Sequence, residues 1–344
     1  MYAIENRIAQ IETHKMKPTD VARDILSELQ GASNSLKLAF IDIANVANND
    51  SSGAYHNYTH TAEAMYSIYE LAKIEYESWT PDDIKASGFE SKEDLILASV
   101  MVMAGHDIGH DGRANAFENP SLELEENSAG LVANIIKKHK LPDVVEKILM
   151  HSILATKVDQ HTVKTNISNY IENPKNPVYV IAQMAAESDL AASISRHYGP
   201  TKGELLAQEV EQSGNKGLAK GLRSFNGRKF FLENMCHMIT AGAKSIGLTS
   251  EVNIQIDAMN RAIEESVPEI KRISSEIVSL EQTSKVLEIT VPELQTLKSE
   301  VSSLKLGAEG THGTNFMLAL AHKLMPEKRP AFEASANHLQ NISL

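Results

Sequence analysis

Helix-start signatures recur along this 344-residue chain and constrain its fold more than any other feature. Apolar residues repeat at intervals of three and four, whereas a strand needs alternation at every second residue. Thr80 precedes a proline and two aspartates, and Ser91 precedes Asp94 by three residues, as at helix N-termini. We therefore predict an all-α fold, a compact multi-helix bundle. The glycine-rich stretch Ser213 to Gly227 has little to bury and is expected to be a loop.

The charge and apolar content of the chain disfavour a nucleic-acid duplex or a membrane surface as partner. The formal net charge is -12, and no Lys/Arg-rich stretch offers the cations that bind a duplex or a membrane surface. The longest apolar run, Leu95 to Gly105, is about half the length that spans a bilayer, so no membrane segment is expected. A single cysteine, Cys236, and an N-terminus without a signal-like apolar core favour a cytoplasmic protein.

Residues near the C-terminus follow a seven-residue apolar repeat that runs from Ile273 to Val301. Pro292 interrupts this repeat, so we expect an antiparallel pair of helices at about 267–288 and 291–306. Their shared apolar stripe either packs on the body of the protein or forms a homo-oligomer seam, and both readings stay open. The expected organisation is a main domain, a helical hairpin and a C-terminal helical segment, at residues 1–262, 263–306 and 307–344.

Histidines and carboxylates gather in two short clusters. His56 and His60 are four residues apart and would share one face of a helix, where one ring could bind a metal while the other handles protons. The second cluster, His106, Asp107 and His110, follows directly after the buried apolar run. A charged aspartate beside such a run costs several kcal/mol unless a cation accompanies it, so a metal explains this cluster better than packing does.

A further carboxylate, Asp189, lies on a helix of small residues at 183–192, with alanines three and four positions away that leave room for an ion. Glu187 lies on another face of that helix, where we expect solvent. Isolated histidines are more often hydrogen-bonded core residues than ligands, and we assign no role to His139, His151, His237 and His322.

These motifs together resemble a known family. Tyr55-His56-Asn57-x-x-His60, His106-Asp107-x-x-His110, Leu154-Ala155-Thr156 and Asp189-Leu190 occur in the order found in the catalytic domain of the class I 3′,5′-cyclic nucleotide phosphodiesterases. Those enzymes belong to the HD-domain metal-dependent phosphohydrolases. The resemblance covers about residues 50 to 240 and implies a phosphodiesterase-like helical bundle.

The resemblance implies two divalent metal ions. His60, His106, Asp107 and Asp189 would hold the tighter ion, usually zinc, with manganese or iron as alternatives. Asp107 would bridge to a second ion, magnesium or manganese, which keeps mostly water ligands. A hydroxide bridging the two ions would then attack the phosphorus of a small phosphate ester, hydrolysing the 3′ ester bond of a cyclic nucleotide.

The same resemblance implies roles for the neighbouring residues. His56 matches the general acid that protonates the leaving 3′ oxygen. His110, Glu126 and Thr156 match the groups that orient the waters of the second ion. Glu126 is aligned through Glu126-Asn127, although the two histidines that follow in the family are absent here.

Substrate recognition departs from the family pattern. Tyr55, Arg228 and Phe231 are the expected substrate-binding residues, with the Phe231 ring stacking on a base. The family reads the purine with a glutamine three residues before its clamping phenylalanine, and Arg228 stands there in this chain, or Gly227 if Phe230 is the clamp. Three hypotheses stay open: a cyclic nucleotide phosphodiesterase, an HD-type hydrolase of another phosphate ester, and a non-catalytic metal-bound helical scaffold.

Overall fold

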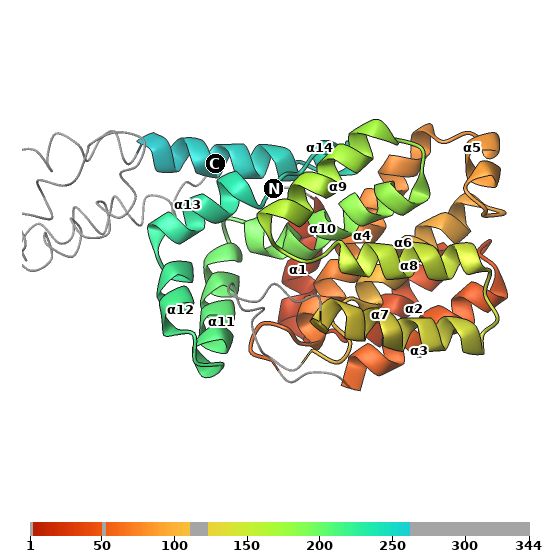
Figure 1. The fold of residues 1–344 in the computed structure, drawn as a ribbon, viewed down its shortest axis with the longest axis horizontal. Coiled ribbons are helices and arrows are strands. Elements are labelled where there is room, and N and C mark those ends of the chain that lie inside the picture. The colour runs from red at the N-terminus through yellow and green to blue at the C-terminus, as the bar shows by residue number, and fades with distance from the viewer. Residues whose placement is uncertain (1–2, 50–52, 111–122, 262–344) are drawn as a thin grey trace, which may run out of the picture. The chain divides into compact units, whose positions relative to one another are not determined.

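The computed structural model describes residues 3–49, 53–110 and 123–261, and these residues form helices and no strand (Figure 1). The predicted all-α fold is therefore confirmed. The predicted hairpin at 263–306 and the segment 307–344 lie outside the described residues. The helices are α1 Ala3–His14, α2 Pro18–Glu28, α3 Asn34–Asn49, α4 Tyr58–Glu75, η1 Tyr76–Ser78, α5 Pro81–Ala86, α6 Lys92–Gly105, α7 Glu123–Lys138, α8 Asp143–Leu154, α9 Gln160–Glu172, α10 Pro177–Ile194, α11 Gly199–Gln212, α12 Lys216–Leu222, α13 Phe225–Asn234 and α14 Ala241–Ser245, and residues 248–261 are also helical.

The chain divides into two compact units. The first unit contains Met1–Leu222 and Phe231–Val252, and the second contains Arg223–Phe230 and Asn253–Leu344. All residues expected to bind metal belong to the first unit. Among the described residues, no helix has both the length and the hydropathy needed to cross a membrane.

Two of the predicted helix starts are observed at the expected residues. The Thr80 side chain accepts a hydrogen bond from the Asp83 amide in a capping box, and the Ser91 side chain accepts one from the Asp94 amide. The expectation of a loop at 213–227 was wrong, because α12 and the start of α13 lie there. Ala219 of α12 is fully buried against α11, so even this glycine-rich stretch buries apolar surface.

Three helices form the centre of the first unit, where α4, α6 and α10 pack against one another. Leucine, valine, methionine and alanine fill α6, and every residue from Asp94 to Gly105 is buried. Such a helix, apolar on all sides, is stable only when other helices surround it. Helices α7 and α8 lie side by side, and α8 also contacts α6 and α10 (Figure 1). This packing brings the first turn of α4, the end of α6 and the last turns of α10 together.

Candidate metal centre and active site

Local backbone structure places the histidines of α4 and α6. The Asn57 side chain caps α4 by accepting hydrogen bonds from the Thr59 and His60 amides, so His60 lies in the first helical turn. His106 is the C-cap residue of α6, and the chain turns tightly after it, where Gly109 has a φ of 81°. Glycine adopts this left-handed backbone conformation without steric cost. The tight turn lets adjacent residues face the same space.

The expected ligand atoms of His60, His106 and Asp189 lie together, and Asp107 lies beside both histidines. His60 Nε2 lies 2.9 Å from Asp189 Oδ1 and 3.4 Å from Asp107 Oδ2. His106 Nε2 lies 3.0 Å from Asp107 Oδ2 and 3.3 Å from Asp189 Oδ1, and the two Nε2 atoms are 3.4 Å apart. Residues of α4, α10 and the turn that ends α6 thus bring two nitrogens and an Asp189 oxygen together, with an Asp107 oxygen beside both nitrogens.

These residues fit a divalent metal ion. Donors about 2.1 Å from a tetrahedral ion lie about 3.4 Å from one another, close to the distances that join the two histidine nitrogens to each other and to the carboxylate oxygens. Among the described residues, the buried Asp107 Oδ2 atom has no hydrogen-bond partner. The other ring nitrogen of His106, Nδ1, lies 2.9 Å from the Met103 carbonyl oxygen, which orients Nε2 toward the cluster. Imidazole and carboxylate are the ligands that zinc, manganese and iron accept.

Charge coupling within the cluster is strong. Burial disfavours protonation of His60, but the Asp107 and Asp189 carboxylates outweigh it and raise its pKa to about 9. His106 responds in the same way, and its pKa is well above the ordinary value. Burial acts against charge on Asp107 and Asp189 too, yet the two histidines hold both carboxyl pKa values below the usual range. Without metal the carboxylates therefore favour protonated histidines, and a cation would compete with those protons.

His56 lies beside this cluster but not on the helix. The expectation that His56 and His60 share a helical face was wrong, because Asn57 is the cap and α4 begins at Tyr58. The rings still lie 5.8 Å apart between centroids. His56 Nδ1 lies 2.5 Å from Glu209 Oε1, while Glu209 Oε2 accepts hydrogen bonds from the Tyr55 and His56 amides. The buried Glu209 carboxylate thereby fixes the ring and leaves the Nε2 of His56 to act on other groups.

Glu209 was not predicted from the sequence as a residue of the site. It lies on α11, 153 residues after His56, and no local motif marks it. Burial raises the pKa of Glu209, but the hydrogen bonds from His56 and the two backbone amides outweigh this effect and lower it. The structure therefore adds an ionised carboxylate to the predicted site.

His110 also joins this group. Its ring stacks on that of His56 at 3.9 Å between centroids and 19° between planes. His56, His110 and Glu209 each bring a ligand atom within 4.8 Å of the others, which is compatible with a second metal site by distance alone. Nearly parallel stacked rings, however, direct their lone pairs side by side and not toward a common ion. This arrangement therefore suits proton handling better than metal binding.

The remaining predicted residues occupy varied positions. The Tyr55 hydroxyl lies 2.9 Å from Ser193 Oγ, and its ring contacts the rings of His56 and His60, a position suited to holding both imidazoles. Thr156 is buried just after α8 and donates to the Ile153 carbonyl. Glu126 is exposed on α7. The water-orienting roles of Thr156, Glu126 and His110 stay predictions.

The predicted base-recognition pair is split between the two units. Arg228 belongs to the second unit, where its Nη2 donates to Gln255 Oε1 at 2.8 Å. Phe231 belongs to the first unit and is half-buried. Their roles stay predictions as well.

The expectation that Glu187 meets solvent was wrong. Only 1% of its surface is exposed, because α10 is surrounded by other helices and has no free face. Its carboxylate accepts hydrogen bonds from the Ile239 amide and from the amide and hydroxyl of Thr240. Burial raises the pKa of Glu187 to about 7 against these hydrogen bonds. Glu187 therefore ties α10 to the chain that precedes α14.

Comparison with solved structures identifies a similar fold. The phosphodiesterase domain of the RhoPDE fusion protein from the choanoflagellate Salpingoeca rosetta matches 71% of this chain and 88% of its own, with a TM-score of 0.50 and 16% sequence identity. The fold is phosphodiesterase-like. No protein-family model and no curated protein matches the chain. At this level of identity the likeness concerns the fold alone.

Proposed function

We propose that this chain is a metal-dependent phosphodiesterase that hydrolyses the 3′ ester bond of a cyclic nucleotide. The observation that carries the proposal is the convergence of His60, His106 and Asp189 in a geometry that fits a divalent ion, with Asp107 Oδ2 beside both histidines. The phosphodiesterase-like fold supports it, since a solved structure with a similar fold is a phosphodiesterase domain. Two divalent ions at this position would activate a water and neutralise charge on the phosphoryl oxygens.

The residues beside the ligands supply the proton chemistry. His56 is held through Nδ1 by Glu209, and its Nε2 is the group that would protonate the leaving oxygen. The carboxylate of Glu209 stabilises the protonated ring through a charge-assisted hydrogen bond. Tyr55 packs against both His56 and His60, so it sets the distance between the proton donor and the ligand cluster. The chain thus holds its acid and its metal ligands side by side.

Substrate profiling of the purified full chain tests the proposal. Cyclic AMP, cyclic GMP and nucleoside monophosphates are offered side by side with Mn²⁺, Mg²⁺ or Zn²⁺, and the products are identified. Release of 5′-monophosphates from a cyclic nucleotide is expected. Hydrolysis confined to monoesters would support another HD-type hydrolase, and binding of metal without hydrolysis of any ester would support the scaffold reading.

The general acid is tested with a variant. His56→Ala should lower kcat by about two to four orders of magnitude with metal content unchanged. His139→Ala is the matched control, because His139 pairs with Asp42 away from the ligand cluster. Loss of metal in His56→Ala would contradict the assignment by making His56 a ligand.

A further inference from the structure

The amine of Lys202 lies buried between carboxylates from two other helices. Lys202 belongs to the first turn of α11 and is 4% exposed. Its Nζ donates to Glu63 Oε1 of α4 at 2.8 Å and to Glu12 Oε1 of α1 at 2.5 Å. A lysine is rarely buried to this extent unless it is paired. One amine therefore joins α1, α4 and α11 at a single point.

The buried charged residues of α11 share one face of the helix. Of the buried side chains of α11, Ala207 and Val210 pack on Ala219 of α12, which lies beside α11 (Figure 1). The other two are the charged Lys202 and Glu209. They are seven residues apart, which is close to two helical turns, so both project from the same face. The face of α11 that reaches His56 is therefore held by charged groups.

Glu209 holds His56 only while α11 keeps its rotation about its own axis. Glu209 Oε1 lies 2.5 Å from His56 Nδ1. A carboxylate about 5–6 Å from the helix axis moves about 2 Å when the helix rotates by about 20°. A shift of that size breaks a hydrogen bond. Apolar contacts with α12 resist such a rotation weakly because they are not directional, whereas an amine between two carboxylates has a fixed position.

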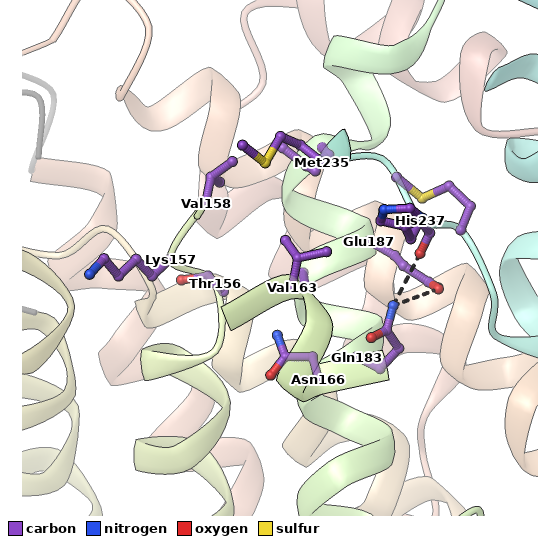
Figure 2. Close-up of a pocket in the computed structure, with 12 residues that line it drawn as sticks. Thr156, Lys157, Val158, Val163, Asn166, Gln183, Glu187, Met235 and His237 are labelled. Atoms are coloured by element: carbon purple, nitrogen blue, oxygen red, sulfur yellow. Dashed lines mark hydrogen bonds between the residues drawn. The ribbon is translucent and has the colours of Figure 1, made fainter. Parts of the chain in front are cut away.

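The metal ligand on α10 is held by other contacts. Glu187 lies two residues before Asp189 on this helix, and its carboxylate accepts hydrogen bonds from the Thr240 amide and from Gln183 Nε2. Figure 2 shows the Gln183 amide hydrogen-bonded to Glu187 and to the His237 carbonyl oxygen. These partners lie outside α11. A displacement of α11 should therefore disturb the proton donor and leave the metal ligands in place.

We propose that Lys202 is a positioning residue for the general acid: it fixes α11 against α4 and thereby keeps Glu209 in hydrogen-bonding contact with His56. This inference rests on the proposed function, because it takes the His56 ring as the proton donor to the leaving oxygen. Lys202 acts through Glu209 and not on the substrate.

A double substitution tests the inference without leaving a buried charge unpaired. Lys202→Met alone would leave Glu63 buried without its cation, whereas replacing a buried ion pair by apolar residues of similar volume often leaves stability unchanged. The full chain carrying Lys202→Met and Glu63→Met is therefore compared with the unaltered protein, both loaded with Zn²⁺ and Mg²⁺. The NMR resonance of the His56 Nδ1 proton and kcat are measured for each.

The proton on His56 Nδ1 reports the hydrogen bond to Glu209 directly. NMR with isotope-labelled histidine should show it at low field in the unaltered protein, where it is assigned by its absence from His56→Ala. In the double variant the resonance should be lost to exchange with water or shift to higher field. An unshifted resonance in the folded double variant overturns the inference, and so does the absence of the resonance from the unaltered protein.

Kinetics gives the readout that separates positioning from a structural role. The double variant should hydrolyse a cyclic nucleotide with kcat about 10- to 100-fold lower and with metal content unchanged. A nitrophenyl phosphodiester, whose leaving group needs no proton, should be hydrolysed at nearly the unaltered rate. An equal loss on both esters would make Lys202 a purely structural residue and overturn the inference.

Two further variants complete the test. Lys73 Nζ donates to Glu70 Oε1 at 3.0 Å within α4, so Lys73→Met with Glu70→Met makes the same substitutions away from α11 and should keep both the resonance and kcat. Loss of the resonance in this control would overturn the inference. If the double variant does not fold, Glu63→Gln keeps the size of the side chain, removes its charge and should shift the resonance in the same direction; an unchanged resonance there overturns the inference as well.

The two readouts distinguish this inference from the proposed function. If the unaltered protein hydrolyses no cyclic nucleotide, the proposed function fails, and the NMR comparison alone decides whether Lys202 keeps Glu209 on His56. If the unaltered protein hydrolyses a cyclic nucleotide and the double variant keeps both the resonance and kcat, the role of Lys202 fails and the proposed function stands.

Discussion

Replacing Glu209 with glutamine isolates the charge of the carboxylate that holds His56. Two backbone amides, those of Tyr55 and His56, donate to Glu209 Oε2, so a glutamine would keep its oxygen toward them. Its NH₂ group would then face His56 Nδ1, now 2.5 Å from a carboxylate oxygen. An NH₂ donor cannot accept the Nδ1 proton of an imidazolium, so the substitution disfavours the protonated ring and leaves the backbone in place.

The expected effect follows from the strength of the lost hydrogen bond. A hydrogen bond to a charged group contributes about 1.5–3 kcal/mol, which corresponds to a roughly 10- to 150-fold fall in kcat if the imidazolium donates to the leaving oxygen. A nitrophenyl phosphodiester, whose leaving group needs no proton, should lose far less. Steady-state kinetics on both esters measures the difference. An equal loss on both, with metal content unchanged, would refute the proton-donor role of His56.

Three further outcomes are expected. Asp107→Asn and Asp189→Asn should each lose bound metal, measured by elemental analysis, and kcat should fall more than about a hundredfold. Full metal content with normal turnover would contradict the ligand assignment. Metal-free protein should lose stability as pH rises from 6.5 through about 9, because the folded state raises the pKa of His60 and the stabilising proton on its ring is lost in that range. A melting temperature that stays constant across that range would contradict the interaction of His60 with the two carboxylates. Gly242→Ala should cost about 1–3 kcal/mol in a denaturant titration, since an added Cβ would lie 2.6 Å from a backbone carbonyl oxygen of α4, whereas Gly130→Ala meets no atom within 4 Å and should not destabilise.

The helical fold, and the gathering of His60, His106 and Asp189, could be predicted because their signals are local. Asp94 to Gly105 is buried throughout, and a helix that is apolar on all sides leaves His106 and Asp107 few positions other than a shared interior site. The cap residue Asn57 was also readable, since asparagine is a preferred N-cap, and it would have placed His56 outside α4.

The partner of His56 could not be predicted in the same way. Glu209 is one of several acids on α11, and only the packing of that helix brings it to a residue 153 positions earlier. The burial of Glu187 depends likewise on the chain around Thr240, which supplies its donors from 53 residues away. Long-range hydrogen bonds of this kind leave no periodic trace in a sequence.

The position of a bound metal ion tests the account most directly. Crystals of the full chain grown with Mn²⁺ are measured near the manganese absorption edge, and an anomalous difference map locates the ion. We expect the strongest peak within about 2.0–2.3 Å of nitrogen and oxygen atoms of His60, His106, Asp107 and Asp189. A map without that peak, or with its strongest peak among the side chains of the His56 and Glu209 group, would contradict the assignment of the metal centre.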